Sequence, residues 1–339
     1  MKQDMYAWLD AQIKAPVKKP LPVLSFPAVQ KLGVTVRTLS GDSDKQAEGI
    51  RLIAANFDCA AAVSYMDLSV EAEAFGSAIR YTDDEVPTVV GSLVDDLAGA
   101  EALKVPAVGA CRTGVNLRAM EKAAALVTDR PLFAGVIGPF SLAGRLLDVS
   151  EAIYYCFDEP ETVHLVLDKV TDFLIAYMNA YKATGANGVV MAEPLAGLLS
   201  GELAEEFSAA YVRKIVAAVQ DERFLVVYHN CGNSALATLD TIATNGCRLF
   251  HFGNIVDMDA VLQRLPADCV AIGNVDPARQ FRNGTPESVY AATAALMARC
   301  GGYPNFIPSS GCDIPPMTDW DNIRAFFRAV DNYYQGRQT

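Results

Sequence analysis

The sequence lacks any uninterrupted apolar run of about 18 residues, the length at which a segment reads as a membrane-spanning helix. It also lacks the apolar core of a secretory signal peptide, because charged and polar residues recur throughout the N-terminal stretch MKQDMYAWLDAQIKAPVKKP. The first absence excludes a spanning helix. The second predicts that the protein stays in the cytoplasm and has no membrane partner.

An excess of positive charge is missing as well. The chain has 28 Lys and Arg residues against 40 Asp and Glu residues, which gives a formal net charge of −12. Such a field repels phosphate backbones and anionic membrane surfaces. The densest basic segment, Lys14–Lys19, is interrupted by Pro16 and is expected to be solvated. These features exclude nucleic acid as a partner.

A disulfide framework is not expected in this chain. Its 8 cysteines are spread over 339 residues that carry no secretion signal, so they are interpreted as buried thiols or metal ligands. With 51% hydrophobic and 20% charged residues, the composition is that of a globular protein with a large core.

Short apolar runs alternate with longer amphipathic segments along the chain. This alternation predicts parallel strands with helical crossovers, and eight units favour an α/β fold, a single (β/α)8 TIM barrel over residues 1–339. Residues 1–20 are predicted to form an N-terminal helical extension, and Gly76 to Arg130 an insertion with an extra hairpin or helices after the second strand. The predicted strands are Pro22–Phe26, Cys59–Tyr65, Leu132–Ile137, Gly188–Glu193, Phe224–His229, Arg248–Phe252, Cys269–Gly273 and Asn305–Ser310.

Polar residues follow several of these runs, and in a parallel barrel such ends meet at one face. His229 and Cys231 lie at i and i+2, so both side chains can point the same way, and Cys312 follows the last run. One imidazole and two thiolates suit zinc and leave a fourth position open, as in catalytic zinc sites. The alternative is that the cysteines are small buried side chains and the histidine caps a strand.

A series of motifs resembles the uroporphyrinogen decarboxylase-like superfamily and, within it, the methylcobamide:coenzyme M methyltransferase branch. The resemblance runs from about residue 20 to 335 and implies a (β/α)8 barrel in which His229, Cys231 and Cys312 bind zinc. The motifs that carry it are DLSVEAEAFG at 67–76, GPFSLAG at 138–144, AEP at 192–194, HNCGN at 229–233, GNVDP at 273–277 and SGCDIPP at 310–316.

The chain departs from the decarboxylases of this superfamily at two places. Their arginine-containing RQAGRY motif binds substrate carboxylates. The corresponding stretch here reads LSFPAVQ, and no arginine precedes Arg37. They also carry a histidine near the end of the last strand, where this chain has Cys312. Both departures disfavour porphyrinogen decarboxylation.

The resemblance implies methyl transfer from a methylated corrinoid, carried by a separate small corrinoid protein, to a thiol such as coenzyme M, with a tetrahydrofolate as an alternative acceptor. Zinc would hold the acceptor thiol as a thiolate beside the methyl group.

Further polar residues at strand ends are candidates for supporting roles. Glu193 is expected to be a base or a fourth zinc ligand, or alternatively a helix-start carboxylate. His251 is expected to reach the open coordination position or the substrate, or alternatively to hydrogen-bond a ligand. Asp67, Asn274 and Asp276 are candidates for cofactor or substrate binding, with local turn and cap bonding as the alternative for the two aspartates.

The same residues and fold are compatible with other functions. A zinc-bound water could attack a carbonyl with the same ligands, although two thiolates make zinc a weaker Lewis acid. A uroporphyrinogen-type decarboxylase and a non-catalytic corrinoid- or metal-binding protein of the same fold are further alternatives.

Overall fold

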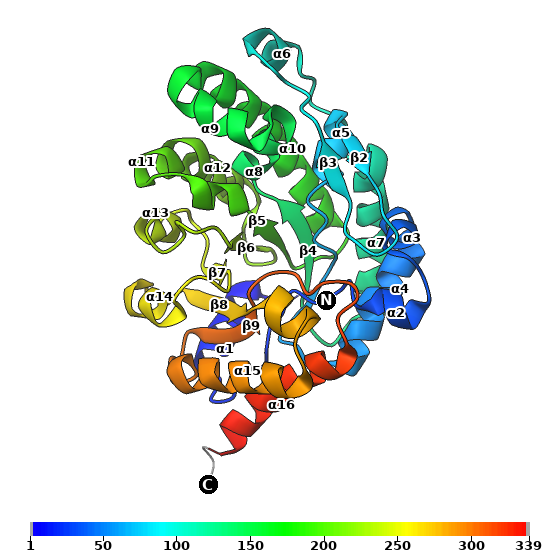
Figure 1. The fold of residues 1–339 in the computed structure, drawn as a ribbon, viewed down its shortest axis with the longest axis vertical. Coiled ribbons are helices and arrows are strands. Elements are labelled where there is room, and N and C mark those ends of the chain that lie inside the picture. Colours follow the sequence, from blue (N-terminus) through cyan, green and yellow to red (C-terminus); the bar gives the residue numbers. More distant parts are fainter. Residues whose placement is uncertain (1–2, 337–339) are drawn as a thin grey trace.

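The central element is a curved sheet of parallel strands wrapped by helices (Figure 1). The computed structural model describes residues 3–336. Every neighbouring pair in the sheet is parallel, so the carboxyl ends of the strands lie together at one end. The TIM-barrel-like fold is therefore confirmed. Within the described range the sheet has seven strands, in the order β1 (Ala62–Val63), β4 (Leu132–Ile137), β5 (Gly188–Ala192), β6 (Leu225–Asn230), β7 (Leu249–Phe252), β8 (Val270–Val275) and β9 (Phe306–Ser310).

The first predicted strand, Pro22–Phe26, is not a strand. The prediction of eight strands is therefore one too many for the described residues. The segment runs between β9 and β1. The amide of Leu21 donates to the carbonyl of Pro308 at 3.0 Å, and that of Ala60 donates to the carbonyl of Pro20 at 2.8 Å. The prolines before and after Leu21 have no N–H group, so a regular ladder cannot form. The barrel is closed there by isolated hydrogen bonds.

Side chains inside the barrel explain how the site residues are positioned. Along β6, Leu225 and Val227 belong to the inner core, whereas Val226 and Tyr228 pack outward against the helices. This alternation, the two-residue period of a strand, turns His229 inward above Leu225 and Val227.

Helix α1 (Met5–Lys14) is the expected N-terminal extension. Its buried Met5 and Trp8 join the inner core, and the ring centroids of Trp8 and Phe133 are 5.9 Å apart. The amide of Met5 donates to the carbonyl of Glu222, ahead of β6, at 2.7 Å. The helix thus closes the amino end of the barrel, opposite the end that carries the polar residues.

The expected insertion lies between β1 and β4 (Figure 1). It contains an antiparallel hairpin of β2 (Ala78–Arg80) and β3 (Thr88–Val90), followed by α6 (Leu97–Ala102). Helices α5 (Val70–Phe75) and α7 (Cys111–Leu126) flank these elements. The extra hairpin and helix predicted from the length of this interval are therefore confirmed.

The remaining helices cover the outside of the sheet or follow its carboxyl ends (Figure 1). These helices are α2 (Ala28–Leu32), α3 (Val36–Gly41), α4 (Ser43–Asn56), α8 (Pro139–Leu147), α9 (Val149–Asp158), α10 (Pro160–Ala183), η1 (Pro194–Leu198), α11 (Gly201–Ala204), η2 (Glu205–Ala209), α12 (Ala210–Val219), α13 (Leu239–Ala243), α14 (Met258–Arg264), η3 (Pro277–Arg282), α15 (Pro286–Cys300) and α16 (Trp320–Gln335). Among residues 3–336, no helix is both long and apolar enough to cross a membrane.

Candidate metal centre

The structure brings together the three residues predicted to bind a metal. His229 is the penultimate residue of β6, Cys231 directly follows this strand, and Cys312 follows β9. Their ligand atoms all lie within 4.8 Å of one another, and Cys312 Sγ is 3.6 Å from His229 Nε2. His229 is buried and both cysteines are half-buried. This group can hold a metal ion such as zinc.

A cavity of about 80 Å³ adjoins the three side chains. Asp313 lies on its wall beside Cys312. The cavity provides space for a fourth ligand, which a structural tetrahedral site filled by protein atoms would not have. The other residues that line it are apolar: Val23, Met66, Leu68, Ala192 and Pro194.

A chain of hydrogen bonds determines which nitrogen of His229 faces the thiols. Ser309 donates its hydroxyl to the carbonyl of Leu21 at 2.8 Å, so its oxygen accepts from His251 Nε2 at 2.9 Å. Burial, together with the neighbouring His229, lowers the pKa of His251 well below its ordinary value, and the neutral ring presents Nδ1 as an acceptor. His229 donates its Nδ1–H to that atom at 2.7 Å. The lone pair of His229 Nε2 is then directed at Cys312.

This tautomer fits a zinc ligand. Histidines that bind zinc present one nitrogen to the metal while the other N–H is held by an outer partner, which orients the ring. Here the outer partner is His251, the residue that pairs with His229 across β6 and β7. His251 contacts His229 on the side away from the thiols and does not line the cavity. It therefore has the alternative role, a hydrogen bond to a candidate metal ligand.

Replacing His251 should weaken zinc binding without unfolding the barrel. In His251→Leu, His229 loses the acceptor that fixes its tautomer, so we expect the zinc dissociation constant to rise about 10- to 100-fold. His251→Gln, which can accept the same hydrogen bond, should recover part of this affinity. Competition against a chromophoric chelator measures the constant, and NMR of the ring nitrogens reports the tautomer of His229. The matched control is His164→Leu, on the outer helix α10, which should leave zinc affinity unchanged. Unchanged affinity in a folded His251→Leu protein would contradict this role.

The two cysteines interact with each other. The hydrogen bond between their sulfur atoms lowers the pKa of Cys231 and raises the pKa of Cys312 to about 12. A proton held between two sulfur atoms is the species that a dication replaces, because metal binding releases thiol protons. The donor set therefore fits zinc in its chemistry as well as in its geometry.

Glycines allow the backbone to pass close to Cys231. A Cβ atom on Gly253 would lie 2.6 Å from both Cα and Cβ of Cys231, and one on Gly197 would lie 2.4 Å from Cα of Gly232. No other residue type fits at such separations, so these glycines hold the turn that carries Cys231 against its neighbours.

Glu193 does not join the candidate ligands. Its carboxylate is fully buried and accepts from the amide of Phe140 at 2.8 Å, the amide of Ser141 at 2.9 Å and the hydroxyl of Ser208 at 2.9 Å. Both amides belong to the first turn of α8, so Glu193 stabilises the start of that helix. Glu193 therefore has the alternative role, that of a carboxylate at the start of a helix. The structure gives Glu193 no contact with the thiols that a base or a fourth ligand would need.

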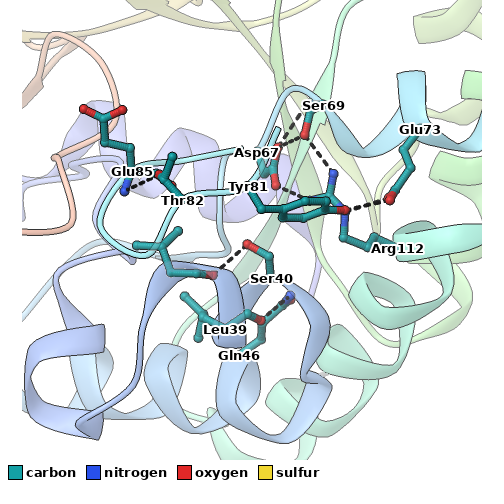
Figure 2. A network of polar contacts seen from close by, with 11 residues as sticks. Leu39, Ser40, Gln46, Asp67, Ser69, Glu73, Tyr81, Thr82, Glu85 and Arg112 are labelled. Carbon is teal, nitrogen blue, oxygen red and sulfur yellow. Dashed lines mark hydrogen bonds and ion pairs between the residues drawn. The ribbon is translucent and has the colours of Figure 1, made fainter. Parts of the chain in front are cut away.

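Asp67 is also committed to other residues of the protein (Figure 2). One of its oxygens accepts from the amide and hydroxyl of Ser69, and the other pairs with Arg112. Arg112 also pairs with Glu73 at 2.6 Å and lies over the ring of Tyr81, with 5.0 Å from its Cζ atom to the ring centroid. The network anchors the loop after β1, whose Met66 and Leu68 form part of the cavity wall, so the effect of Asp67 on the site is indirect.

The last two candidates serve the local backbone. Asn274 donates its amide to the carbonyls of Gly253 and Val256, at 2.8 and 2.7 Å. Asp276 caps η3 through the amides of its first turn and accepts from Asn254 at 3.0 Å. Neither residue lines the cavity. Asp276 therefore follows the turn-and-cap alternative, and Asn274 supports the loop behind Cys231.

Sequence reasoning missed several residues that shape the site. Asp313 could have been found, because it directly follows Cys312 in SGCDIPP. Burial raises its pKa well above the ordinary value, and the adjacent Cys312 adds to this shift. Ser309 and Arg112 gave no comparable signal, since Ser309 acts through His251 and Arg112 lies far from Asp67 in the sequence.

Comparisons with known proteins give the family. The sequence model described as Uroporphyrinogen decarboxylase (URO-D) matches residues 23–333. The chain belongs to the uroporphyrinogen decarboxylase family. The resemblance to this family and to its methyltransferases, inferred above from the motifs, is thereby confirmed.

Relatives within the uroporphyrinogen decarboxylase family carry two kinds of name. The methylcobamide:CoM methyltransferase of Methanosarcina acetivorans is 30% identical over 79% of this chain and 78% of its own length. The uroporphyrinogen decarboxylase of Pseudomonas syringae is 27% identical over 80% of this chain and 78% of its own. A methyltransferase from Methanosarcina mazei has a similar structure, with a TM-score of 0.85, 23% identity and coverage of 98% of this chain and 99% of that one. This last similarity concerns the fold.

Proposed function

We propose that this protein is a zinc-dependent methyltransferase that moves a methyl group from a methylated corrinoid to a thiol. The observation that carries the proposal is the group of His229, Cys231 and Cys312 beside a cavity large enough for a further ligand. Two relatives named methylcobamide:CoM methyltransferase support a methylated corrinoid as the donor and coenzyme M as one thiol acceptor in the family.

The residues of the site are suited to such a reaction. Zinc bound by the three side chains would lower the pKa of an acceptor thiol and hold it as a thiolate. The imidazole of His229 is oriented by His251, and the apolar wall formed by Met66, Leu68 and Pro194 keeps water from the sulfur. The thiol would release its proton to solvent, its sulfur would form a bond to the methyl carbon, and the electron pair of the broken cobalt–carbon bond would stay with cobalt.

The same end of the barrel carries exposed apolar side chains. Leu198, Ile255 and Met317 follow β5, β7 and β9 and are 47%, 56% and 44% exposed. Because they follow the carboxyl ends of parallel strands, they lie at the end of the barrel that holds the cysteines. Exposed apolar side chains at this end of the barrel would suit contact with an apolar macrocycle or a partner protein. A small corrinoid protein is the partner that this proposal requires.

Methylcobalamin provides a direct test. Zinc-loaded protein mixed with methylcobalamin and a thiol should convert the methyl–cobalt spectrum and form the methyl thioether, and removal of zinc by a chelator should stop the conversion. Addition of zinc should restore it. The matched control is the chelated protein given magnesium, which does not suit two thiolate ligands. Absence of any zinc-dependent conversion with all thiols and with tetrahydrofolate would overturn the proposal.

Decarboxylation of a tetrapyrrole is the less favoured function. It requires cations to hold several substrate carboxylates, and the described residues that line the cavity include no lysine or arginine. It also predicts turnover that persists after zinc has been removed, so the chelation arm of the same assay separates the two functions.

A further inference from the structure

Arg145, on α8, is a half-buried cation without a partner. Among residues 3–336 it is the only lysine or arginine that is not exposed and yet has no hydrogen bond, ion pair or aromatic contact. Other cations at buried or half-buried positions, such as Arg112 and Lys169, bond to carboxylates or carbonyl oxygens. Burial lowers the pKa of Arg145 below its ordinary value, and no carboxylate nearby opposes this shift. The positive charge of Arg145 is therefore uncompensated within the described part of the chain.

A half-buried guanidinium of this kind is unfavourable until a ligand completes its bonding. Removal of a charge from water without a counterion destabilises the folded protein, and a desolvated polar group without a partner marks a place for a ligand or an ion. The chain has 40 acidic residues, so possible partners are abundant in the sequence. That none of them pairs with Arg145 favours an external anion as its partner.

The fold places Arg145 at the end of the barrel that carries the cysteines. Helix α8 begins two residues after β4, and its Ser141 accepts from the amide of Leu195 at 3.1 Å. Leu195 directly follows Pro194, which lines the cavity. Arg145 comes one helical turn after Ser141, so both side chains leave α8 on the same side. Long side chains on a helix point back toward its N-terminus, which directs the guanidinium toward the carboxyl end of β4.

The ligand of Arg145 has to extend beyond the cavity, because Arg145 is not one of the residues that line it. Helix α8 is packed closely against η1 at this rim, since a Cβ atom on Gly144 would lie 2.5 Å from Cδ1 of Leu195. Leu198, the last residue of η1, is 47% exposed. A guanidinium is a planar fork that matches carboxylate, sulfonate and phosphate groups with two parallel hydrogen bonds. The rim thus suits a ligand that is partly apolar and partly anionic.

We propose that Arg145 binds one anionic group, a carboxylate, sulfonate or phosphate, of a substrate that occupies the candidate metal centre. The anionic group belongs either to the far end of the acceptor thiol or to the corrinoid donor. The inference rests on the proposed function, because it takes the ligand of Arg145 from that reaction. A single cation still does not supply the several carboxylate-binding groups that decarboxylation of a tetrapyrrole requires.

Two pairs of ligands test this inference on the whole zinc-loaded protein by calorimetric titration. The acceptor pair is 2-mercaptoethanesulfonate and the uncharged 2-mercaptoethanol. The donor pair is cyanocobalamin, which carries a phosphate, and dicyanocobinamide, which does not. In Arg145→Met, the dissociation constant of the anionic or phosphate-bearing member of one pair should rise about 10- to 100-fold, because a charge-assisted hydrogen-bonded pair is lost. The other member of that pair should bind as before, and the pair that responds identifies the source of the anion.

Further variants separate this role from a structural one. Arg145→Lys should recover part of the lost affinity, since it keeps the charge without the planar fork. Because Arg145 has no partner in the folded chain, Arg145→Met should leave the melting temperature unchanged or raise it. The matched control is Arg51→Met, on the outer helix α4, which should leave the binding of both pairs unchanged.

Two kinds of result would overturn the inference. One is an Arg145→Met protein that binds both members of each pair with unchanged affinity, or with equal losses for the two members. The other is a clear fall in its melting temperature, which would show that the guanidinium stabilises the fold. Either result leaves the proposed function intact if the unmodified protein demethylates methylcobalamin in the zinc-dependent assay. Absence of that conversion overturns the proposed function itself.

Discussion

Cys312→Ser should lose bound zinc and methyl transfer while the barrel stays folded. Serine replaces a soft thiolate by a hydroxyl that does not ionise near neutral pH, so only His229 and Cys231 remain as ligands. We expect the zinc dissociation constant to rise by more than about 100-fold, the upper range seen when only an outer partner of a ligand is removed. Metal analysis after gel filtration and the methylcobalamin assay measure the two losses.

Cys300→Ser is the matched control for this variant. Cys300 lies fully buried on α15, away from the cavity, so its replacement should leave zinc content and activity unchanged. The stability of Cys312→Ser distinguishes a catalytic from a structural metal, because loss of a structural zinc would remove several kcal/mol of folding free energy. Retention of a full equivalent of zinc by Cys312→Ser would contradict the assignment of Cys312 as a ligand.

Arg112→Met should lower the free energy of unfolding by about 3–5 kcal/mol, the range for breaking a buried ion pair by removing one partner. The side chains of Arg112, Asp67 and Glu73 are 8%, 6% and 21% exposed, so both carboxylates would be left without their cation (Figure 2). Because the same network anchors Met66 and Leu68, thiol binding should weaken as well. Denaturant unfolding followed by circular dichroism measures the stability.

An exposed ion pair serves as the comparison. Arg51 pairs with Glu48 on α4, and both side chains are 42% exposed. Arg51→Met should therefore change the free energy of unfolding by no more than about 1 kcal/mol. Equal losses of unfolding free energy in Arg51→Met and Arg112→Met would show that the buried network stabilises the fold no more than an exposed ion pair does.

Prediction from the sequence succeeded where a local pattern is sufficient. The apolar runs that become β4, β5, β6, β7, β8 and β9 are bounded by polar or glycine residues, and the period of the strand sets which side chains turn inward. His229 and Cys231 are two positions apart on such a run, so their common direction follows from the backbone. The prediction of the first strand was wrong for a local reason too. Prolines lack the N–H groups that a strand ladder needs, and the apolar character of the segment does not take this into account.

The candidates for supporting roles show the limit of the sequence. Glu193, Asp67 and Asp276 are carboxylates at strand ends and look alike in the sequence. Their partners distinguish them: the first turn of α8 for Glu193, Arg112 for Asp67, and the cap of η3 with Asn254 for Asp276. The partners of Glu193 and Asp67 are tens of residues away in the chain, so only the folded structure brings them into contact.

By itself the sequence determined the alternation of strands and helices, the family, and the three residues able to bind a metal, because periodicity and short motifs record these properties locally. Only the tertiary structure decided that His251 orients His229, that Glu193 stabilises a helix, and that Asp313 lies on the cavity wall with Cys312. These properties depend on distances between side chains from different strands, and such distances exist only once the barrel has closed.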